Sequence, residues 1–408
     1  MIPRNAIVLV TDRLGAGYLG PYGNTWIETR AWNRLAAEAT LFETALVDTP
    51  SLTRIYDSYW HGCHALSGLS QPSPPPLAQL LGEKPVESWL VTDERLVAEL
   101  PAASAFDERI VLPPGEEKPA GTLEGTQLAR LFATLIDVLR QQATSPFLIW
   151  VHAQAMQGPW DAPYYLRSRF VEPGDPAPPD FTRPPEVHLQ ADCDPDLLLG
   201  IQHAYGGQVT LFDSCLEILL DALGASSLSD TTALLATAAR GYPLGEHRYV
   251  GQGELPLYGE LLQVPWMLRW PQLAGATRRI QQMVQPPDLY TTLLNWFGMP
   301  PAETVWGRAL LPEDIKFSAT PDQLIACSQH DQQVSIRVPG WFMRRVGEQQ
   351  VELFVKPDDR WECNEISDRC IQVVEAMTGT LNQFQAAVHA NQRQQISSLD
   401  RKLQQQFF

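Results

Sequence analysis

Several patterns that would assign this chain of 408 residues to a common class are missing. None of its six cysteines forms a Cys-x-x-Cys pair, so we predict free thiols and a reducing compartment. No run of about 18 apolar residues occurs, which argues against a membrane-spanning helix. The N-terminus enters a strand without the charged and apolar regions of a signal peptide. We therefore expect a cytoplasmic protein.

Basic residues are scarce relative to acidic ones. Lys and Arg number 30 and Asp and Glu number 47, which gives a net charge of −17. An acidic field of this size repels nucleic acid and anionic membranes, so we expect neither as a partner. It leaves room for a local basic pocket that binds a small anion.

Short apolar runs alternate with helical patterns over most of the chain. Strands are predicted at 6–11, 86–93, 146–154, 231–238 and 264–271, and helices at 29–40, 126–142, 207–225 and 288–298. Such alternation favours an α/β fold with a mostly parallel central sheet and helices on both faces. We expect this α/β domain to span residues 1–315.

The pattern changes in the C-terminal part. Four short apolar runs predict a small antiparallel sheet, which with the helix that follows forms a subdomain over 316–380. The remainder, 381–408, is rich in Gln and is predicted to be helical or frayed. Proline-rich segments at 71–79 and 171–188 predict loops.

Two strand ends carry the most informative residues. The strand in "VLVTDRLGAGYLGPYGN" (8–24) delivers Asp12 at its carboxyl end, where α/β proteins hold ligands. Asp12 could ligate a metal ion or could cap a helix N-terminus. A second strand, in "LLATAARGYPLGEH" (234–247), ends in two alanines and Arg240.

The first of these stretches resembles the N-terminus of the sulfatase family of the alkaline-phosphatase superfamily. That family has a strand ending Asp-Asp-Leu-Gly-x-Gly-x-Leu-Gly-x-Tyr-Gly. Later segments are similar to the family's in the same order: "PFLIWVHAQAMQGPWDAPYY", "GEH…LYGELLQVPWMLRWP", "DLYTTLLNWFGMPP…WGRALLP" and "ELFVKPDDRWECNEISD". The resemblance covers nearly the whole chain and implies an alkaline-phosphatase/sulfatase-like sandwich.

The resemblance also implies a calcium site, but its ligand positions differ here. The family's two adjacent aspartates fall on Asp12 and Arg13. The later Asp and His (or Asn) fall on Ala239 and Arg240. A hard divalent cation needs several oxygen ligands, so we predict no metal and no cofactor. We predict instead that Arg240 lies within ~3 Å of Asp12 or of an equally close acceptor.

The nucleophile position differs as well. In the resembled family a Cys or Ser, oxidised to formylglycine, lies four residues before an arginine. Counting back from Arg54 reaches Pro50, whose side chain can be neither oxidised nor made to attack. Ser51 and Thr53 are neighbouring hydroxyls that could act as nucleophiles if a base or metal activated them.

Two further family positions have changed, while much of the scaffold is retained. The Pro-His of the family becomes Met156-Gln157, and the lysine of its Gly-Lys-Gly becomes Gln252. The retained positions are Gly15, Gly17, Gly20, Arg54, Gly245, Glu246 and His247.

Other polar clusters have two interpretations each. His152, near a strand end, is either a satisfied core histidine or an anion contact or residual acid. "ADCDPD" (191–196) is interpreted as a solvated acidic loop rather than a calcium loop. "HGCHA" (61–65) offers three soft ligands without a fourth, so zinc is not expected.

Three functions remain open at this point. The chain could be a catalytically inactive sulfatase-like protein that binds an anion or a protein partner. It could be a sulfuric or phosphoric ester hydrolase with an unconventional site, or a purely structural protein. For the first, the predicted ligand-binding residues are Arg13, Arg240, His152 and His247. The ligand would be a sulfated or phosphorylated small molecule or glycan.

Overall fold

The computed structural model describes residues 4–67, 73–141, 146–251, 256–271, 278–301, 305–313, 315, 319–347 and 350–404. The chain divides into two compact units, each assembled from separate segments. The first contains Met1–Leu41, Leu81–Leu255 and Val264–Ile280, and the second Phe42–Leu80, Pro256–Gln263 and Gln281–Phe408. Residue 315 lies within the second unit, and the domain boundaries expected from the sequence stay predictions.

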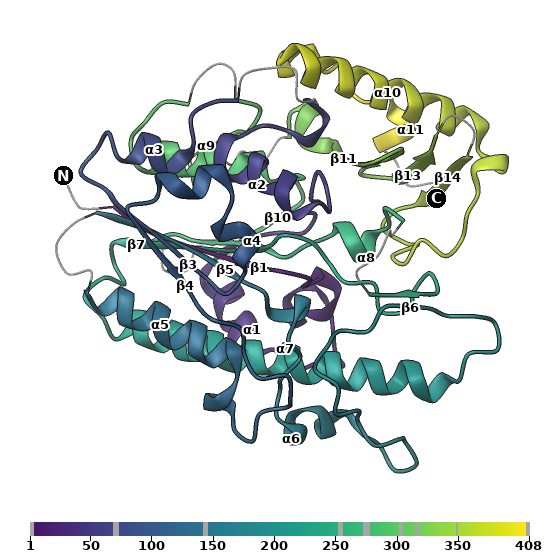
Figure 1. The fold of residues 1–408 in the computed structure, drawn as a ribbon. Helices are drawn as coiled ribbons and strands as arrows, with labels where there is room; N and C mark the ends of the chain where they lie inside the picture. The colour runs from purple at the N-terminus through teal and green to yellow at the C-terminus, as the bar shows by residue number, and fades with distance from the viewer. Residues whose placement is uncertain are drawn as a thin grey trace. The chain divides into compact units, whose positions relative to one another are not determined.

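The first unit is organised around an eight-stranded, mostly parallel sheet (Figure 1). The strand order is β10 (Arg278–Ile280), β2 (Thr40–Phe42), β9 (Trp266–Arg269), β7 (Thr232–Ala238), β1 (Asn5–Thr11), β5 (Phe147–Ala153), β3 (Glu87–Thr92) and β4 (Glu108–Val111). β1 pairs in parallel with both β5 and β7, whereas β9 runs antiparallel to β7. The expected α/β sheet and the central position of its first strand are confirmed.

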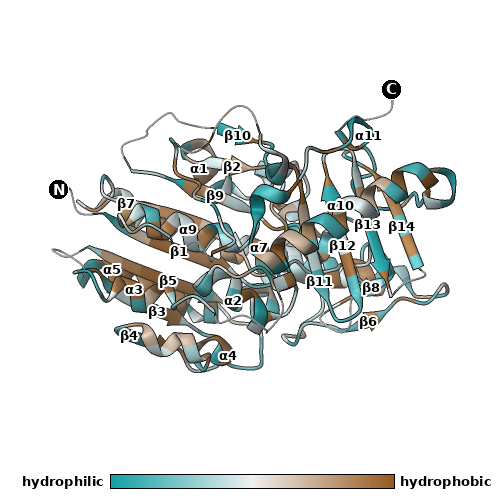
Figure 2. Cartoon of the chain, turned by 90° about the horizontal axis from the view of Figure 1, so that it is seen from above, coloured by the Kyte–Doolittle hydropathy of each residue, from teal (hydrophilic) through white to brown (hydrophobic). Residues whose placement is uncertain are grey.

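The central strands are buried along their whole length and mostly apolar. All seven residues of β1, β5 and β7 are buried, and Figure 2 shows these strands largely in brown. Strands covered on both faces need this continuous apolar pattern. Val10 of β1 pairs with His152 on one side and with Thr237 on the other, so the carboxyl ends of three strands meet at one edge.

Three long helices of this unit, α1 (Arg30–Glu38), α5 (Gln127–Gln141) and α7 (Pro195–Gly224), pack together along one face of the sheet (Figure 1). The Asp213 carboxylate on α7 accepts hydrogen bonds from the backbone of Ala31 and Trp32, each 3.1 Å long, and so caps α1. Among the described residues, no helix is both long and apolar enough to cross a membrane.

The start of α7 differs from the sequence prediction. The helix was expected over 207–225 but begins at Pro195, and Asp194 of the predicted acidic loop caps it by accepting from Asp196 N–H (3.0 Å). Gly206 and Gly207 hid this continuation, because glycine weakens helix propensity. A Cβ at Gly207 would lie 2.8 Å from Arg167 Cγ, so glycine is required there for close packing.

The proline-rich segment 171–188 is a loop, as predicted, until the short strand β6 (Val187–His188), which pairs with β8 (Tyr249–Val250). A fully buried arginine, Arg167, holds the loop and the preceding segment 160–162 in place by donating to four backbone carbonyls. The acceptors are Trp160 O, Ala162 O (3.2 Å), Pro179 O (2.5 Å) and Phe181 O (3.0 Å).

The second unit contains the predicted small antiparallel sheet. Its strands are β11 (Ala326–His330), β12 (Gln333–Val338), β13 (Trp341–Val346) and β14 (Gln350–Val355), and α10 (Ile371–Ala390) shares their hydrophobic core. The Gln-rich tail also joins this core: Leu403, in α11 (Arg401–Gln404), is fully buried. The other helices are α2 (Leu52–His61), α3 (Leu77–Leu81), α8 (Gly259–Leu262) and α9 (Pro287–Trp296) in this part of the chain, and α4 (Arg95–Ala98) and α6 (Tyr164–Arg167) in the first unit.

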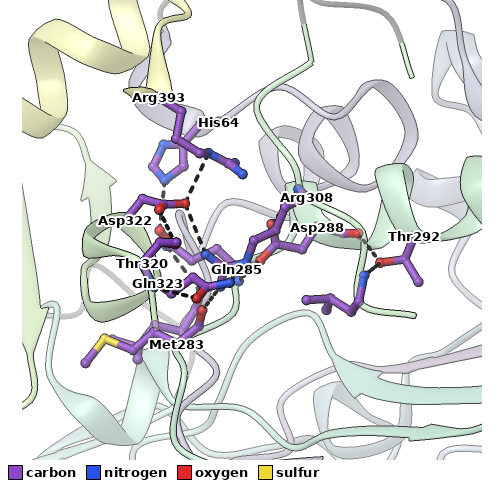
Figure 3. A network of polar contacts seen from close by, with 12 residues as sticks. His64, Met283, Gln285, Asp288, Thr292, Arg308, Thr320, Asp322, Gln323 and Arg393 are labelled. Atoms are coloured by element: carbon purple, nitrogen blue, oxygen red, sulfur yellow. Dashed lines mark hydrogen bonds and ion pairs between the residues drawn. The ribbon is translucent and has the colours of Figure 1, made fainter. Parts of the chain in front are cut away.

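A polar network gathers distant segments of the second unit (Figure 3). Arg308 and Arg393 both approach the Asp322 carboxylate, at 3.4 and 3.7 Å. His64 Nε2 lies 3.2 Å from Gln285 Oε1. These contacts tie the segment around residue 64 to segments more than two hundred residues later.

The histidines of "HGCHA" have structural partners in this unit. Leu66 N–H donates to His64 Nδ1 (3.1 Å), so Nε2 carries the proton and donates to Gln285. Burial lowers the pKa of the His64 imidazole to about 3, which keeps it neutral. His61 Nδ1 lies 2.6 Å from Pro74 O. Within the described ranges, no group of three His, Cys, Asp or Glu side chains is placed to hold a metal ion, and none of the six cysteines is in a disulfide.

Candidate functional site

Backbone hydrogen bonds join the carboxyl ends of β1, β5 and β7 just beyond the last strand residues. Ala239 N–H donates to Thr11 O and Asp12 N–H donates to Ala153 O, both at 2.8 Å. Met156 N–H in turn donates to Asp12 O (3.2 Å). These bonds hold the chain in place where four polar side chains meet: Asp12, Arg13, Gln157 and Arg240, which we call the strand-end cluster.

Arg240 donates two hydrogen bonds to the carboxylate of Asp12. Arg240 Nε lies 2.9 Å from Asp12 Oδ1, and Nη2 lies 3.0 Å from Oδ2. This two-bond geometry is the strong form of a guanidinium–carboxylate pair and confirms the predicted contact. The helix-cap alternative for Asp12 is wrong, because both its oxygens face Arg240 and the next turn, Ala16–Tyr18, begins at Gly15.

The pair is buried. Asp12 has no exposed surface, and the Arg240 side chain is 13% exposed. Burial alone would raise the pKa of Asp12, but Arg240, and to a smaller degree Arg13 and His152, bring it below its ordinary value. Asp12 therefore stays ionised at neutral pH, balanced by the guanidinium that it binds.

Arg13 is the second guanidinium of the cluster and is 4% exposed. Its backbone has φ 63°, a left-handed conformation that is uncommon for residues other than glycine. Tyr205 O–H donates to Arg13 O (3.0 Å) and supports this backbone. Burial, then repulsion from Arg240, lower the pKa of Arg13 to about 9, while Asp12 acts in the opposite direction. Arg13 thus carries its charge in an environment that disfavours it.

Gln157 lies between the two guanidiniums. Its Oε1 accepts from Arg13 Nε at 3.1 Å and from Arg240 Nη2 at 3.3 Å. The structure therefore brings Asp12, Arg13, Gln157 and Arg240 together as the sequence led us to expect. Ala239, which is fully buried, contributes only its backbone.

His152 is a buried neutral histidine on β5. It has no exposed surface, and burial, reinforced by Arg240, lowers the pKa of its imidazole to about 4 despite the opposing effect of Asp12. A residual general acid at neutral pH would need the protonated form, so that interpretation does not fit.

The Gly-Glu-His segment lies in the turn before β8. Glu246 accepts two hydrogen bonds: Tyr18 O–H donates to Oε1 and Leu244 N–H to Oε2, both at 2.7 Å. His247 is half-buried in the same turn. Gln252 lies outside the described residues.

Three aromatic side chains group together beside the cluster. The rings of Tyr205 and Tyr242 stack at 5.5 Å, and both contact the ring of Trp160, whose Nε1–H donates to Met156 O (2.8 Å). Tyr242 lies two residues after Arg240 in the sequence. The chain separation of the other rings concealed the grouping.

The predicted nucleophile segment belongs to the second unit. Pro50 is buried before α2, and Ser51 occupies the N-cap of that helix. Ser51 Oγ lies 3.2 Å from Thr53 Oγ1, so its hydroxyl contact is to another hydroxyl rather than to a base. The Arg54 guanidinium donates to Ala65 O.

Asp48, in the same segment, has no exposed surface and is expected to make stability depend on pH. Its Oδ2 accepts from Ser58 Oγ (2.6 Å) and Ala65 N–H (2.8 Å), yet burial raises its pKa to about 7. Because the folded-state pKa lies above the ordinary value of 3.8, the stabilisation is complete below about pH 4 and is lost as the pH rises to about 7.

We therefore expect Asp48→Asn to flatten the pH dependence of the free energy of unfolding between about pH 4 and 7, as measured by urea denaturation. Each pKa unit corresponds to about 1.4 kcal/mol. The matched control is Asp331→Asn, since Asp331 is 74% exposed. A wild-type slope that persists in Asp48→Asn would assign the pH dependence to other groups.

The residues of the strand-end cluster do not fit a hard divalent cation. Such a cation takes several oxygen ligands. The cluster offers one carboxylate, Asp12, and both its oxygens already accept from Arg240. Arg13 and Arg240 would both repel a cation at this position.

Comparisons with known proteins agree with this fold. The sulfatase family model matches residues 4–299. A search of curated protein sequences found no match. Among solved structures, the chain is similar to a phosphonate monoester hydrolase of Agrobacterium radiobacter, with a TM-score of 0.76, 16% identity, and coverage of 95% of this chain and 96% of that one.

Two further structures show the same similarity of fold. One, solved in complex with its substrate D-glucosamine-2-N,6-O-disulfate, has a TM-score of 0.78 and 15% identity, with 95% of this chain and 99% of that one covered. The other, a 2-O glycosaminoglycan sulfatase, has a TM-score of 0.73 and 16% identity, with 98% and 96% covered. On the evidence of its matching family model, the chain belongs to the sulfatase family.

Proposed function

We propose that this chain is a sulfatase-family protein that does not hydrolyse sulfate esters and instead binds an anionic ester group at the strand-end cluster. The observation that carries the proposal is the pair of hydrogen bonds from Arg240 to Asp12. Because of them, the remaining family carboxylate is bound to a guanidinium. Proline at position 50 and alanine at 239 support it, because neither side chain offers an attacking atom or a metal ligand.

The ligand that we propose is a sulfated or phosphorylated small molecule or glycan. Guanidiniums recognise sulfate and phosphate oxygens with charge-assisted hydrogen bonds, and the cluster holds two of them. Structures of similar fold include one in complex with a disulfated glucosamine. A protein partner stays a prediction. The six unpaired cysteines suit a reducing compartment, and we propose the cytoplasm.

The test is hydrolysis of 4-nitrophenyl sulfate and 4-nitrophenyl phosphate by the purified chain, with and without excess calcium, magnesium or manganese. We expect no release of nitrophenol above the uncatalysed rate and no stoichiometric divalent metal by elemental analysis. The control variants are Ser51→Ala and Thr53→Ala. Turnover by the wild type that either variant abolishes would overturn the proposal and identify a hydroxyl nucleophile.

A further inference from the structure

The position of Gln157 Oε1 is unusual for a side-chain amide. One neutral oxygen accepts from Arg13 Nε and from Arg240 Nη2, while Arg240 also holds the Asp12 carboxylate. One buried guanidinium and one partly buried guanidinium thus converge on a point that an uncharged group occupies. Electrostatic repulsion between the two cations contributes to the lowered pKa of Arg13.

A charged oxygen would suit this point better than an amide oxygen. Hydrogen bonds from guanidinium to an oxyanion are roughly twice as strong as those to neutral acceptors. They strengthen further where water is excluded, as around the nearly buried Arg13. Gln157 Oε1 therefore stands where one oxygen of an anionic ligand would be held.

Hydrogen bonds hold the backbone beneath Gln157 in place. Met156 N–H donates to Asp12 O, and Trp160 Nε1–H donates to Met156 O. Gln208 Nε2 donates to Ala155 O (3.4 Å). Gln157 itself is half-buried.

We propose that Gln157 is a latch on an oxyanion site formed by Arg13 and Arg240, and that the oxygen of a sulfate or phosphate group displaces its amide oxygen. This inference rests on the proposed function and adds its regulation. The latched cluster keeps both guanidiniums hydrogen-bonded in the absence of ligand. Competition by Gln157 lowers the apparent affinity for the anion. The apparent affinity equals the intrinsic affinity multiplied by the fraction of molecules in which Gln157 is turned away from the arginines.

The experiment measures binding of inorganic sulfate and of inorganic phosphate to the full chain by calorimetry and thermal shift, against chloride at equal ionic strength. Gln157→Ala removes the competing oxygen, so we expect about tenfold tighter anion binding, the effect of losing a hydrogen bond to a charged group. Gln157→Glu places a permanent carboxylate at the same point, so we expect a higher melting temperature and no response to either anion.

Gln154→Ala is the matched control, because Gln154 lies on the same turn but donates to Glu94 Oε2 (2.9 Å), away from the arginines. It should bind anions as the wild type does. Should Gln157→Ala not fold, Gln157→Asn, too short to reach both guanidiniums, takes its place with the same expectation.

Equal or weaker anion binding by Gln157→Ala would overturn the latch. Absence of any response in the wild type and in Gln157→Ala would overturn both the latch and the anion site, and would leave the expected lack of hydrolysis untouched. Anion binding by the wild type that Gln157→Ala does not tighten would overturn the latch alone, whereas ester turnover by the wild type would overturn the proposed lack of hydrolysis. The two failures are therefore distinguishable.

Discussion

Replacing Arg240 by alanine is expected to lower the free energy of unfolding by about 3–5 kcal/mol, because it leaves the Asp12 carboxylate buried without its partner. Asp12 has no exposed surface, and both its oxygens depend on Arg240. The loss should shrink as pH falls, since without Arg240 burial favours protonation of Asp12. Urea denaturation at neutral and mildly acidic pH measures both effects.

The matched control for this change is Arg30→Ala. Arg30 pairs with Glu28 at 2.8 Å, a distance similar to that of the buried pair, but the two side chains are 73% and 55% exposed. A solvent-exposed pair of this kind contributes little to stability. Equal losses from Arg240→Ala and Arg30→Ala would show that the strand-end pair does not support the fold. The double change Asp12→Leu with Arg240→Met should recover much of the loss, because neither charge then remains buried.

Replacing Arg167 by methionine is expected to lower the free energy of unfolding by a similar amount. Methionine keeps the apolar volume of the side chain. It leaves four backbone carbonyls, two in the loop and two in the preceding segment 160–162, without their donor. Each buried acceptor left unsatisfied costs about 1–3 kcal/mol, reduced where water can enter. Limited proteolysis should reveal new cleavage within 171–188, because the guanidinium secures Pro179 and Phe181.

Arg169→Met serves as the control for this loop. Arg169 follows two residues later, but its side chain is 51% exposed and lies 3.8 Å from Glu28. We expect it to leave both the unfolding curve and the proteolysis pattern unchanged. If Arg167→Met is cleaved at the wild-type rate, the loop is held by contacts other than this arginine.

The parts of the fold that the sequence predicts are those with a local physical signal. The strands β1, β5 and β7 are continuous apolar runs, and this pattern alone identifies strands covered on both faces. The contact of Arg240 with Asp12 followed from the family resemblance together with the requirement that a buried guanidinium finds an acceptor.

The remaining features depend on residues far apart in the chain. Gln157 meets Arg13 across 144 residues and Arg240 across 83, so no local pattern indicates that one oxygen serves both. Arg167 likewise gave no signal, because its partners are backbone carbonyls, which any residue supplies. The early start of α7 was not predicted because Gly206 and Gly207, which pack against Phe170 and Arg167, lower the helix propensity there.

The His64–Gln285 contact of the second unit can form only late in the synthesis of the chain. The two residues are 221 positions apart, and Ser328 Oγ, which donates to Val47 O, lies 281 positions from its acceptor. At ordinary elongation speeds the ribosome needs roughly 10–45 s to travel from His64 to Gln285. The nascent segment 42–80 therefore waits, with its apolar side chains uncovered, until the last third of the chain emerges. During that interval we expect chaperones to bind the segment. A chain truncated after β7 would leave its apolar side chains uncovered permanently.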